Sequence, residues 1–372
     1  MKRLFSVFAA AIVFCAVFAS DEYTVIVNPA ENASTGARIN WHTDEGSGAE
    51  ACIYTKRSDT KWKHSKTIDA TQEHVTAYDS LMSKRPDGTD CIERVRFVRN
   101  TVELQGLVPD TEYMYRFSDD KDAPVRYFKT APADGAWTAA VISDFHSYTP
   151  LPKRAVAAMA MLDTLESVNG GDFDMVLHVG DICAWGGSYS FWRDLYEKSQ
   201  FSKYMWAGVN GNHDNMDRKS TRLSNDYFRY ANNNPLNGYP GEMGVCYFFK
   251  YGQVLFIMLN NEMMRKDKGL AAAQQWVKKV ITENPTKYIV VMEHYQWFFA
   301  NTGKTSQYER WHNLFDEYGV DLAIAGNNHI YARTNAIYND CETDGTKGTV
   351  YLQTPSSDNE RGQATGEWTD NK

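Results

Sequence analysis

Five short groups of polar side chains follow five apolar runs in the second half of this 372-residue chain. The apolar runs have the length and the flanking turn residues that are typical of buried strands, and they cover residues 139–143, 175–179, 204–209, 288–292 and 320–325. The polar groups that follow them are Asp144-Phe145-His146, Gly180-Asp181, Gly211-Asn212-His213-Asp214, Glu293-His294 and Gly326-Asn327-Asn328-His329. In an open sheet with helical crossovers the carboxyl ends of the strands line one crevice, so we expect these five groups to converge.

The side chains in these groups are those that bind divalent metal ions. Asp144 and His146 are two residues apart, and Asp181 has two oxygens that can bridge two cations. The side-chain carbonyl of Asn212 is a hard oxygen ligand. The adjacent His213 points elsewhere on the turn and is free for acid chemistry. Each group alone has a plainer interpretation, such as a turn aspartate or a hydrogen-bonded structural histidine. Their order and number predict a pair of divalent ions and the hydrolysis of a phosphate ester.

The first residues have a different character from the rest of the chain. Lys2 and Arg3 precede an uncharged run over residues 4–18, and small residues stand at the −3 and −1 positions of a cleavage site after Ala19. This pattern predicts a signal peptide over residues 1–19 and an exported protein, which is periplasmic, bound to the cell surface or secreted. The run is too short to span a membrane comfortably, and no later segment of that length is free of charge.

Net charge also limits the function. The chain carries a formal charge of −8 and has a pI near 5.6. Proteins that bind the nucleic-acid backbone need a basic face, so nucleic-acid binding is not expected. The sequence leaves the oligomeric state open. It also leaves open whether Cys52 and Cys91 form a disulfide or are two buried thiols, since five cysteines follow the signal peptide and cannot all pair.

The pattern of secondary structure divides the remaining chain into two parts. Residues 20–131 contain short alternating strands, among them 37–42, 51–55 and 94–104, and no long helix, which predicts an all-β sandwich. Residues 131–135 have the composition of a linker. Beyond it, strands alternate with helical stretches at 152–168, 270–281 and 307–318, which predicts an α/β layered domain over residues 132–372.

The ordered series D-x-H, G-D, G-N-H-D, H and G-x-x-H resembles the calcineurin-like metallophosphoesterases. With the β-sandwich before it, whose residues 107–117 and 128–132 resemble a fibronectin type III-like module, the chain looks like a purple acid phosphatase-type phosphohydrolase. The resemblance covers residues 21–362, including 247–261, which look like the family's central hairpin. It implies a four-layer α/β/β/α sandwich with two divalent or trivalent ions (Fe, Mn or Zn). The substrate would be a small phosphate ester, either a monoester or a diester, cleaved by metal-activated hydroxide.

The resemblance also implies a role for each candidate residue. The metal ligands would be Asp144, His146 and His329 for the first ion, Asp181 for both ions, and Asn212, His294 and Asn327 for the second ion. His213 would be the catalytic histidine, which protonates the leaving group or positions the phosphate. Asp214 would hold the other ring nitrogen of His213 and orient it.

Three departures from the family pattern affect these expectations. The last motif usually reads G-H-x-H, but here Asn327 stands at the first histidine, which predicts a weak second site that tolerates Mn²⁺ and Mg²⁺. Ala184 stands where plant-type purple enzymes have the tyrosine that colours them, so the protein need not be purple. The chain ends at Lys372, earlier than family members do, which suggests a truncated domain. Asn327 also supports an alternative function, an exported non-catalytic binding or adhesion protein with a degenerate site.

Overall fold

The computed structural model describes residues 22–356, apart from residues 48, 85, 217–223, 266 and 299–302. The expected signal peptide, residues 1–19, lies outside the described residues. Within them, no helix combines the length and the apolar character that a membrane span requires.

The N-terminal part consists of strands packed as two sheets. The strands are β1 (Tyr23–Pro29), β2 (Gly36–Thr43), β3 (Ala51–Lys56), β4 (Lys66–Asp69), β5 (Thr71–Lys84), β6 (Asp90–Gln105), β7 (Glu112–Arg116) and β8 (Arg126–Lys129). One sheet has the order β4-β3-β7-β8, and β1, β2, β5 and β6 belong to the other. Buried side chains such as Trp41 and Leu104 from one sheet pack against Tyr115 and Phe128 from the other. The expected all-β N-terminal domain is confirmed.

The C-terminal part alternates strands and helices as the periodicity predicts. Its elements are β9 (Ala139–Ile142), α1 (Lys153–Asn169), β10 (Met175–His178), α2 (Tyr189–Tyr196), α3 (Ser199–Lys203), β11 (Met205–Gly208), α4 (Asp226–Ala231), β12 (Tyr247–Tyr251), β13 (Val254–Met258), the 3₁₀ turn η1 (Glu262–Arg265), α5 (Asp267–Glu283), β14 (Tyr288–Met292), α6 (Ser306–Tyr318), β15 (Leu322–Ala325), β16 (Ala332–Arg333), β17 (Ile337–Tyr338), β18 (Cys341–Glu342) and β19 (Val350–Gln353). Every one of the five expected strands is present. In the first helix the side chain of Val156 is 58% exposed, whereas Ala155, Ala158, Met159 and Leu162 are buried.

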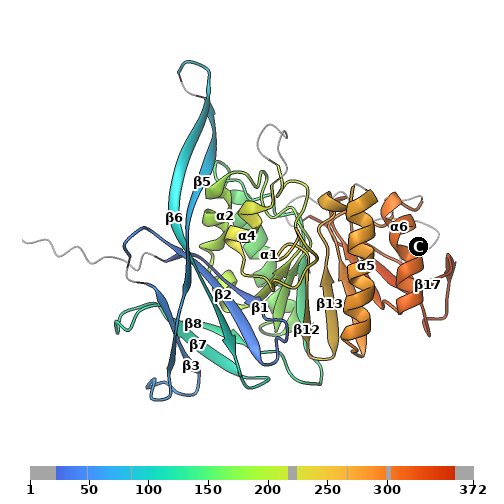
Figure 1. The fold of residues 1–372 in the computed structure, drawn as a ribbon, viewed down its shortest axis with the longest axis horizontal. Coiled ribbons are helices and arrows are strands. Elements are labelled where there is room, and N and C mark those ends of the chain that lie inside the picture. The colour runs from blue at the N-terminus through green and yellow to red at the C-terminus, as the bar shows by residue number, and fades with distance from the viewer. Residues whose placement is uncertain are drawn as a thin grey trace, which may run out of the picture.

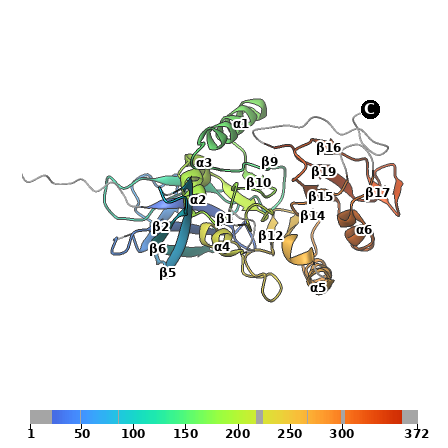
Figure 2. The same cartoon turned by 90° about the horizontal axis from the view of Figure 1, so that it is seen from above.

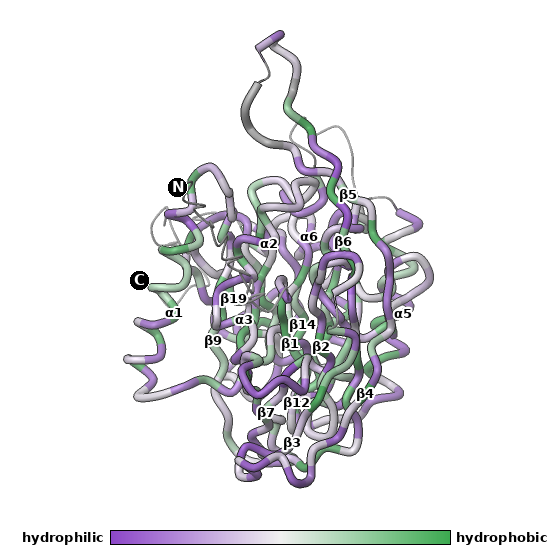
Figure 3. The backbone as a smooth tube through the Cα atoms, turned by 90° about the vertical axis from the view of Figure 1, so that its left-hand side faces the viewer, coloured by the Kyte–Doolittle hydropathy of each residue, from purple (hydrophilic) through white to green (hydrophobic). Residues whose placement is uncertain are grey.

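Two sheets lie face to face in this part, with helices on their outer sides (Figure 2). One core lies between the sheets and includes Leu177 and Ala207 from one sheet and Phe256 and Met292 from the other. A second core lies between the helices α1, α2 and α3 and the sheet that contains β9, β10 and β11. A third core lies between the helices α5 and α6 and the other sheet, whose strand order is β12-β13-β14-β15-β19-β16. Figure 3 shows apolar segments in the central strands and polar loops around them. The four-layer architecture is confirmed.

The two parts of the chain share a sheet. Strand β1 pairs in parallel with β11, which makes one seven-stranded sheet in the order β5-β6-β2-β1-β11-β10-β9. The buried Asn28 of β1 fixes this junction, because its Nδ2 donates to the carbonyl of Trp206 at 2.8 Å and its Oδ1 accepts from the backbone N–H of Asn233 at 2.8 Å. The linker at residues 131–135 therefore does not separate two independent bodies.

The β5–β6 hairpin projects from the body of the molecule (Figure 1). At its base the Tyr227 hydroxyl bonds both the N–H and the carbonyl of Tyr78, so the edge strand is pinned to the α/β domain. Cys91 lies on this hairpin, whereas Cys52 is buried in β3, and both are free thiols. The Cys52–Cys91 bridge that the sequence left open is not formed in the structure, in which Cys52 is buried and Cys91 half-buried.

Candidate metal centre

The expected site residues converge at the carboxyl ends of strands from both sheets. Parallel strands β9, β10 and β11 lead into the segments that carry Asp144, Asp181 and His213, and parallel strands β14 and β15 lead into those of His294 and His329. Three groups of side chains come close enough to hold a metal ion: Asp144, His146 and His329; Asp144, Asp181 and His294; and His146, Asp181 and His213, with ligand atoms within 4.8 Å of one another in each group.

The backbone is held in an uncommon conformation at most of these positions. Asp144, His146, Asp181, Asn327 and His329 all have left-handed φ angles between 47° and 64°. This region is sparsely populated by residues other than glycine, and each such residue costs on the order of 1 to 3 kcal/mol. Among the described residues, half of the ten non-glycine positions with positive φ are therefore candidate ligands. Strain of this kind is concentrated at functional sites, where packing around the site maintains it.

Two glycines allow the strands to approach closely enough for the site to form. A Cβ on Gly180, which has a φ of 88°, would lie 2.5 Å from Nδ1 of His294. A Cβ on Gly211 would lie 2.2 Å from both the backbone nitrogen and Oδ1 of Asp181. Any larger residue at either position would displace a candidate ligand.

Asp181 lies at the centre of the cluster. Its Oδ2 is 3.3 Å from Nε2 of His146 and 3.2 Å from Nε2 of His294, which belong to different sheets. Its Oδ1 accepts a hydrogen bond from the backbone N–H of His213 at 2.8 Å. One carboxylate thus faces imidazoles from both halves of the site.

These separations match those between two ligands of one ion. Two ligand atoms that are each about 2.1 Å from a metal lie about 3.0 to 3.4 Å apart at tetrahedral or octahedral angles. His329 Nε2 and Asp144 Oδ1 are 3.2 Å apart without the geometry of a hydrogen bond, so Asp144 Oδ1 has no hydrogen-bond partner among the described residues. The buried Oδ1 of Asn212 is also without a described partner. Buried polar atoms are nearly always paired, so converging atoms of this kind fit a metal ion.

The charges in the cluster also favour a cation. Burial opposes protonation of His294, but the nearby carboxylates of Asp181 and Asp144 more than offset it and raise its pKa to about 10. Burial likewise opposes ionisation of Asp181, yet His294 and His146 hold its pKa well below the usual range. Positive charge is therefore stabilised at this point, and a metal ion that binds here would displace protons.

His213 is placed by the backbone rather than by Asp214. Its Nδ1 lies 2.8 Å from the carbonyl of Ala184, an acceptor, so Nδ1 carries a proton and Nε2 is left for the site. Asp214 accepts instead from the backbone N–H groups of Cys183 at 2.8 Å and Gly211 at 2.9 Å. The expectation that Asp214 orients the His213 ring is wrong, because both of its oxygens are used to hold the loops together. Burial and the charge of Asp181 raise the pKa of Asp214 to about 7.

Asn327 lies at the site and has a partner that the sequence did not suggest. Its backbone N–H donates to Oδ2 of Asp144 at 3.2 Å, and its Nδ2 donates to Oε1 of Gln296 at 2.5 Å. Gln296 lies outside the five polar groups. The one feature of the sequence that could have indicated its place at the site is its position two residues after His294.

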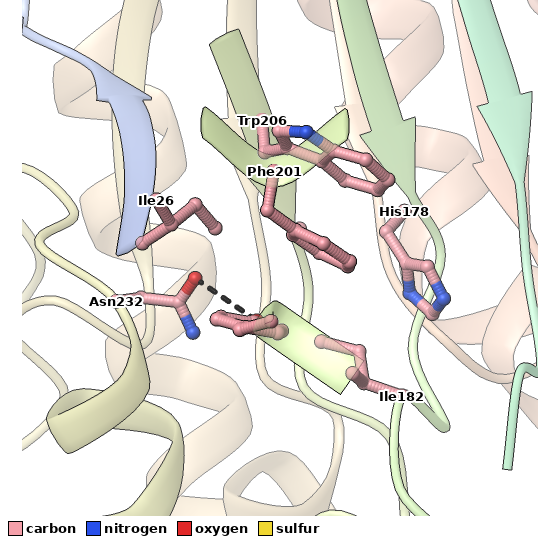
Figure 4. A pocket seen from close by; sticks show the side chains of 8 residues that line it. Ile26, His178, Ile182, Phe201, Trp206 and Asn232 are labelled. Carbon is pink, nitrogen blue, oxygen red and sulfur yellow. Dashed lines mark hydrogen bonds between the residues drawn. The ribbon is translucent and has the colours of Figure 1, made fainter. Parts of the chain in front are cut away.

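Two further buried groups lie near the site, and the sequence assigned neither of them a role. His178, at the end of β10, accepts from the backbone N–H of Gly180 at 3.2 Å, and burial lowers its pKa to about 3. Glu293 is fully buried next to His294, and burial raises its pKa well above the usual range. Figure 4 shows His178 at the side of a small pocket whose other walls are mainly apolar, such as Ile182 and Trp206. No candidate ligand lines this pocket, so it is distinct from the metal centre.

Comparison with known proteins agrees with this geometry. Residues 138–331 match the calcineurin-like phosphoesterase family, and residues 23–130 match the purple acid phosphatase N-terminal domain. An uncharacterised protein of Mycobacterium tuberculosis is 24% identical, with 86% of this chain and 66% of that protein aligned. Purple acid phosphatase 15 of Arabidopsis thaliana is 23% identical over 64% of this chain and 50% of its own length. The chain thus spans between half and two thirds of these curated relatives.

Two solved structures share the fold at low sequence identity. Purple acid phosphatase PPD1 from yellow lupin (Lupinus luteus) seeds superposes with a TM-score of 0.65 and 15% identity, over 90% of this chain and 64% of that one. The structure of PhoD gives a TM-score of 0.57 and 15% identity, over 91% of this chain and 78% of that one. With the family match over more than half of its residues and the converging carboxylates and imidazoles, the chain belongs to the calcineurin-like phosphoesterase family and carries an N-terminal domain of the purple acid phosphatase type.

Proposed function

We propose that this protein is an exported phosphohydrolase that holds two metal ions and cleaves a small-molecule phosphate ester. The observation that carries the proposal is the position of Asp181, whose Oδ2 lies 3.3 Å from Nε2 of His146 and 3.2 Å from Nε2 of His294. A single carboxylate that faces imidazoles from two sheets is suited to bridge two cations. Export rests on the signal-like residues 1–19 alone.

Seven residues would hold the ions: Asp144, His146 and His329 the first, Asp181 both, and Asn212, His294 and Asn327 the second. When bound, such ions lower the pKa of a water molecule and offset the charge of the phosphoryl oxygens. The amide oxygens of Asn212 and Asn327 would make the second site richer in oxygen ligands than a site with a histidine at position 327. Such a site favours Mn²⁺ or Mg²⁺ over Zn²⁺.

His213 has the geometry of an acid or a phosphate-positioning residue. Nδ1 donates to the carbonyl of Ala184, which holds the ring in one orientation. Its other nitrogen, when it too carries a proton, can donate to a phosphate oxygen or to the leaving group. Its ring centroid lies 4.9 Å from that of His146 and 6.4 Å from that of Trp185. Trp185 in turn contacts Tyr148 edge to face at 5.8 Å, so an aromatic wall stands next to the proposed acid.

Metal depletion and reconstitution test the proposal. The protein, stripped with a chelator, should regain hydrolysis of a phosphate monoester or diester when Mn²⁺, Zn²⁺ or Fe²⁺ is added. Asp181→Asn should not regain it, whereas Asp122→Asn, at an exposed position in the N-terminal domain, should behave as wild type. Stoichiometric metal binding without turnover on any ester would favour the non-catalytic binding protein instead.

A further inference from the structure

Gln296 and Asn327 form an amide pair at the edge of the candidate metal centre. Asn327 Nδ2 donates to Oε1 of Gln296 at 2.5 Å, and both side chains are partly buried. The backbone around Asn327 is fixed independently, since its N–H bonds Asp144 Oδ2 at 3.2 Å and the N–H of Gly326 bonds the carbonyl of His294 at 2.9 Å. The pair therefore links the segment after β14 to the segment after β15, and each segment carries a candidate ligand.

The orientation of the Asn327 amide decides whether it can serve a cation. The two ends of a carboxamide have nearly the same shape, but the oxygen attracts a cation and the NH₂ group repels it. A donor is needed to pair with Gln296 Oε1, so the hydrogen bond directs Nδ2 towards Gln296 and turns Oδ1 to the opposite side. The left-handed backbone at Asn327, with a φ of 64°, fixes the direction of its Cα–Cβ bond, and the hydrogen bond to Gln296 then restrains the side-chain torsions that orient the amide.

We propose that Gln296 is a positioning residue for the second metal ion, which acts by holding the Asn327 amide with its oxygen towards the ligands. The inference rests on the proposed function, because it assumes that a second ion binds. It assigns a purpose to the residue that departs from the family pattern: the asparagine replaces the imidazole as a ligand, and the glutamine supplies the orientation that a carboxamide lacks.

The size of the effect follows from the strength of one neutral hydrogen bond. Such a bond favours one amide orientation over the other by about twofold to twelvefold. Gln296→Ala should therefore weaken binding of the second ion by that factor and leave the first ion unchanged. Gln296→Glu should preserve binding or tighten it, because a carboxylate still accepts from Nδ2 and adds negative charge.

The experiment is a titration of the metal-free protein with Mn²⁺ by isothermal titration calorimetry. The variants are Gln296→Ala, Gln296→Glu, Asn327→Ala and the double variant Gln296→Ala/Asn327→Ala, each checked for wild-type thermal unfolding. Gln72→Ala is the matched control, because Gln72 forms a similar amide pair with Asn100 at 2.9 Å within the N-terminal sheet. We expect the double variant to bind the second ion no more weakly than Asn327→Ala alone, since Gln296 acts through Asn327.

Different results would overturn the positioning role of Gln296 alone or the proposed function as well. Gln296→Ala with wild-type affinity for both ions, or Gln296→Glu as weak as Gln296→Ala, overturns the positioning role while the proposed function stands. An equal loss on removing Gln296 with and without Asn327 shows that Gln296 acts independently of Asn327, and also overturns it. A wild-type protein that binds fewer than two ions overturns the proposed function and this inference together.

Discussion

Replacing His213 with alanine should slow turnover and leave metal binding intact. In the structure the His213 ring is fixed by its Nδ1 contact with Ala184, and its backbone N–H holds Oδ1 of Asp181 at 2.8 Å. The substitution removes the ring but keeps the N–H, so the central carboxylate keeps its position. The loss should therefore report on the imidazole alone.

The expected loss depends on the leaving group. General acid catalysis by a positioned side chain contributes about 10²- to 10⁴-fold, which corresponds to about 2.7 to 5.4 kcal/mol in the activation barrier. An alkyl alcohol leaves as a strongly basic oxygen and should show the whole loss. A nitrophenolate needs little protonation, so its ester should lose about tenfold or less.

The measurement is kcat/KM for wild type and His213→Ala with a series of alkyl and aryl phosphates, together with the metal content of each protein. His213→Gln serves as a control, because the glutamine amide can donate a hydrogen bond to phosphate but cannot transfer a proton to the leaving group. Equal losses across the series, with recovery in His213→Gln, would refute the acid role and leave phosphate positioning. A missing ion in His213→Ala would make the residue a ligand, a possibility that its proximity to His146 and Asp181 raises.

Four further predictions follow from particular contacts. Asp181→Asn should reduce kcat by more than about 100-fold with loss of bound metal, since changes to groups that only support ligands already cost 10- to 100-fold; near-normal kcat with both ions bound would contradict the bridging role. Asn327→His should shift the preference of the second site from Mn²⁺ towards Zn²⁺ in a metal titration of activity, and identical titrations would mean that Asn327 does not face the ion. Asp214→Asn should lower the free energy of unfolding by about 1 to 3 kcal/mol in urea, because an amide cannot accept from both Cys183 and Gly211, and an unchanged urea midpoint would contradict this. Burial lowers the pKa of His42 from 6.5 to about 3, so as the pH falls below 6.5 this histidine binds a proton in the unfolded chain but not in the folded one. Between pH 7 and pH 4.5 this difference should reduce the free energy of unfolding by about 2 to 3 kcal/mol, and His42→Gln should lack the decrease.

Local pattern was sufficient for the elements that position the site. The apolar runs at 288–292 and 175–179 became β14 and β10, because a strand buried on both faces needs an apolar side chain at nearly every position. The helix at α6 was also predictable, and the structure shows its N-terminus capped by the Thr305 hydroxyl and its C-terminus by Gly319 with a φ of 66°. The buried face of α1 was harder to predict, because Val156 and Ala155 are both apolar and adjacent, and only the packed fold shows that Ala155 is covered and Val156 is exposed.

The sequence also determined which residues meet at the metal centre, but not how they are oriented. Asp144, Asp181 and His294 could be named in advance because each directly follows a strand, and the ends of parallel strands converge whatever the loops do. The partner of His213 could not be named, because the family resemblance implied Asp214 whereas the ring nitrogen lies against the carbonyl of Ala184, 29 residues away.

Only the tertiary structure decided the contacts between distant segments. The sequence divided the chain near residue 131, whereas the pairing of β1 with β11 merges both parts into one sheet through Asn28. It placed Asn327 at the second ion as an isolated substitution, whereas the fold supplies Gln296 from another loop as its hydrogen-bond partner. The physical reason is the same in both cases. Hydrophobic periodicity is a property of neighbouring residues and can be read from the chain, but a buried polar group pairs with whatever donor or acceptor the packed layers bring within about 3 Å, and that depends on the whole fold.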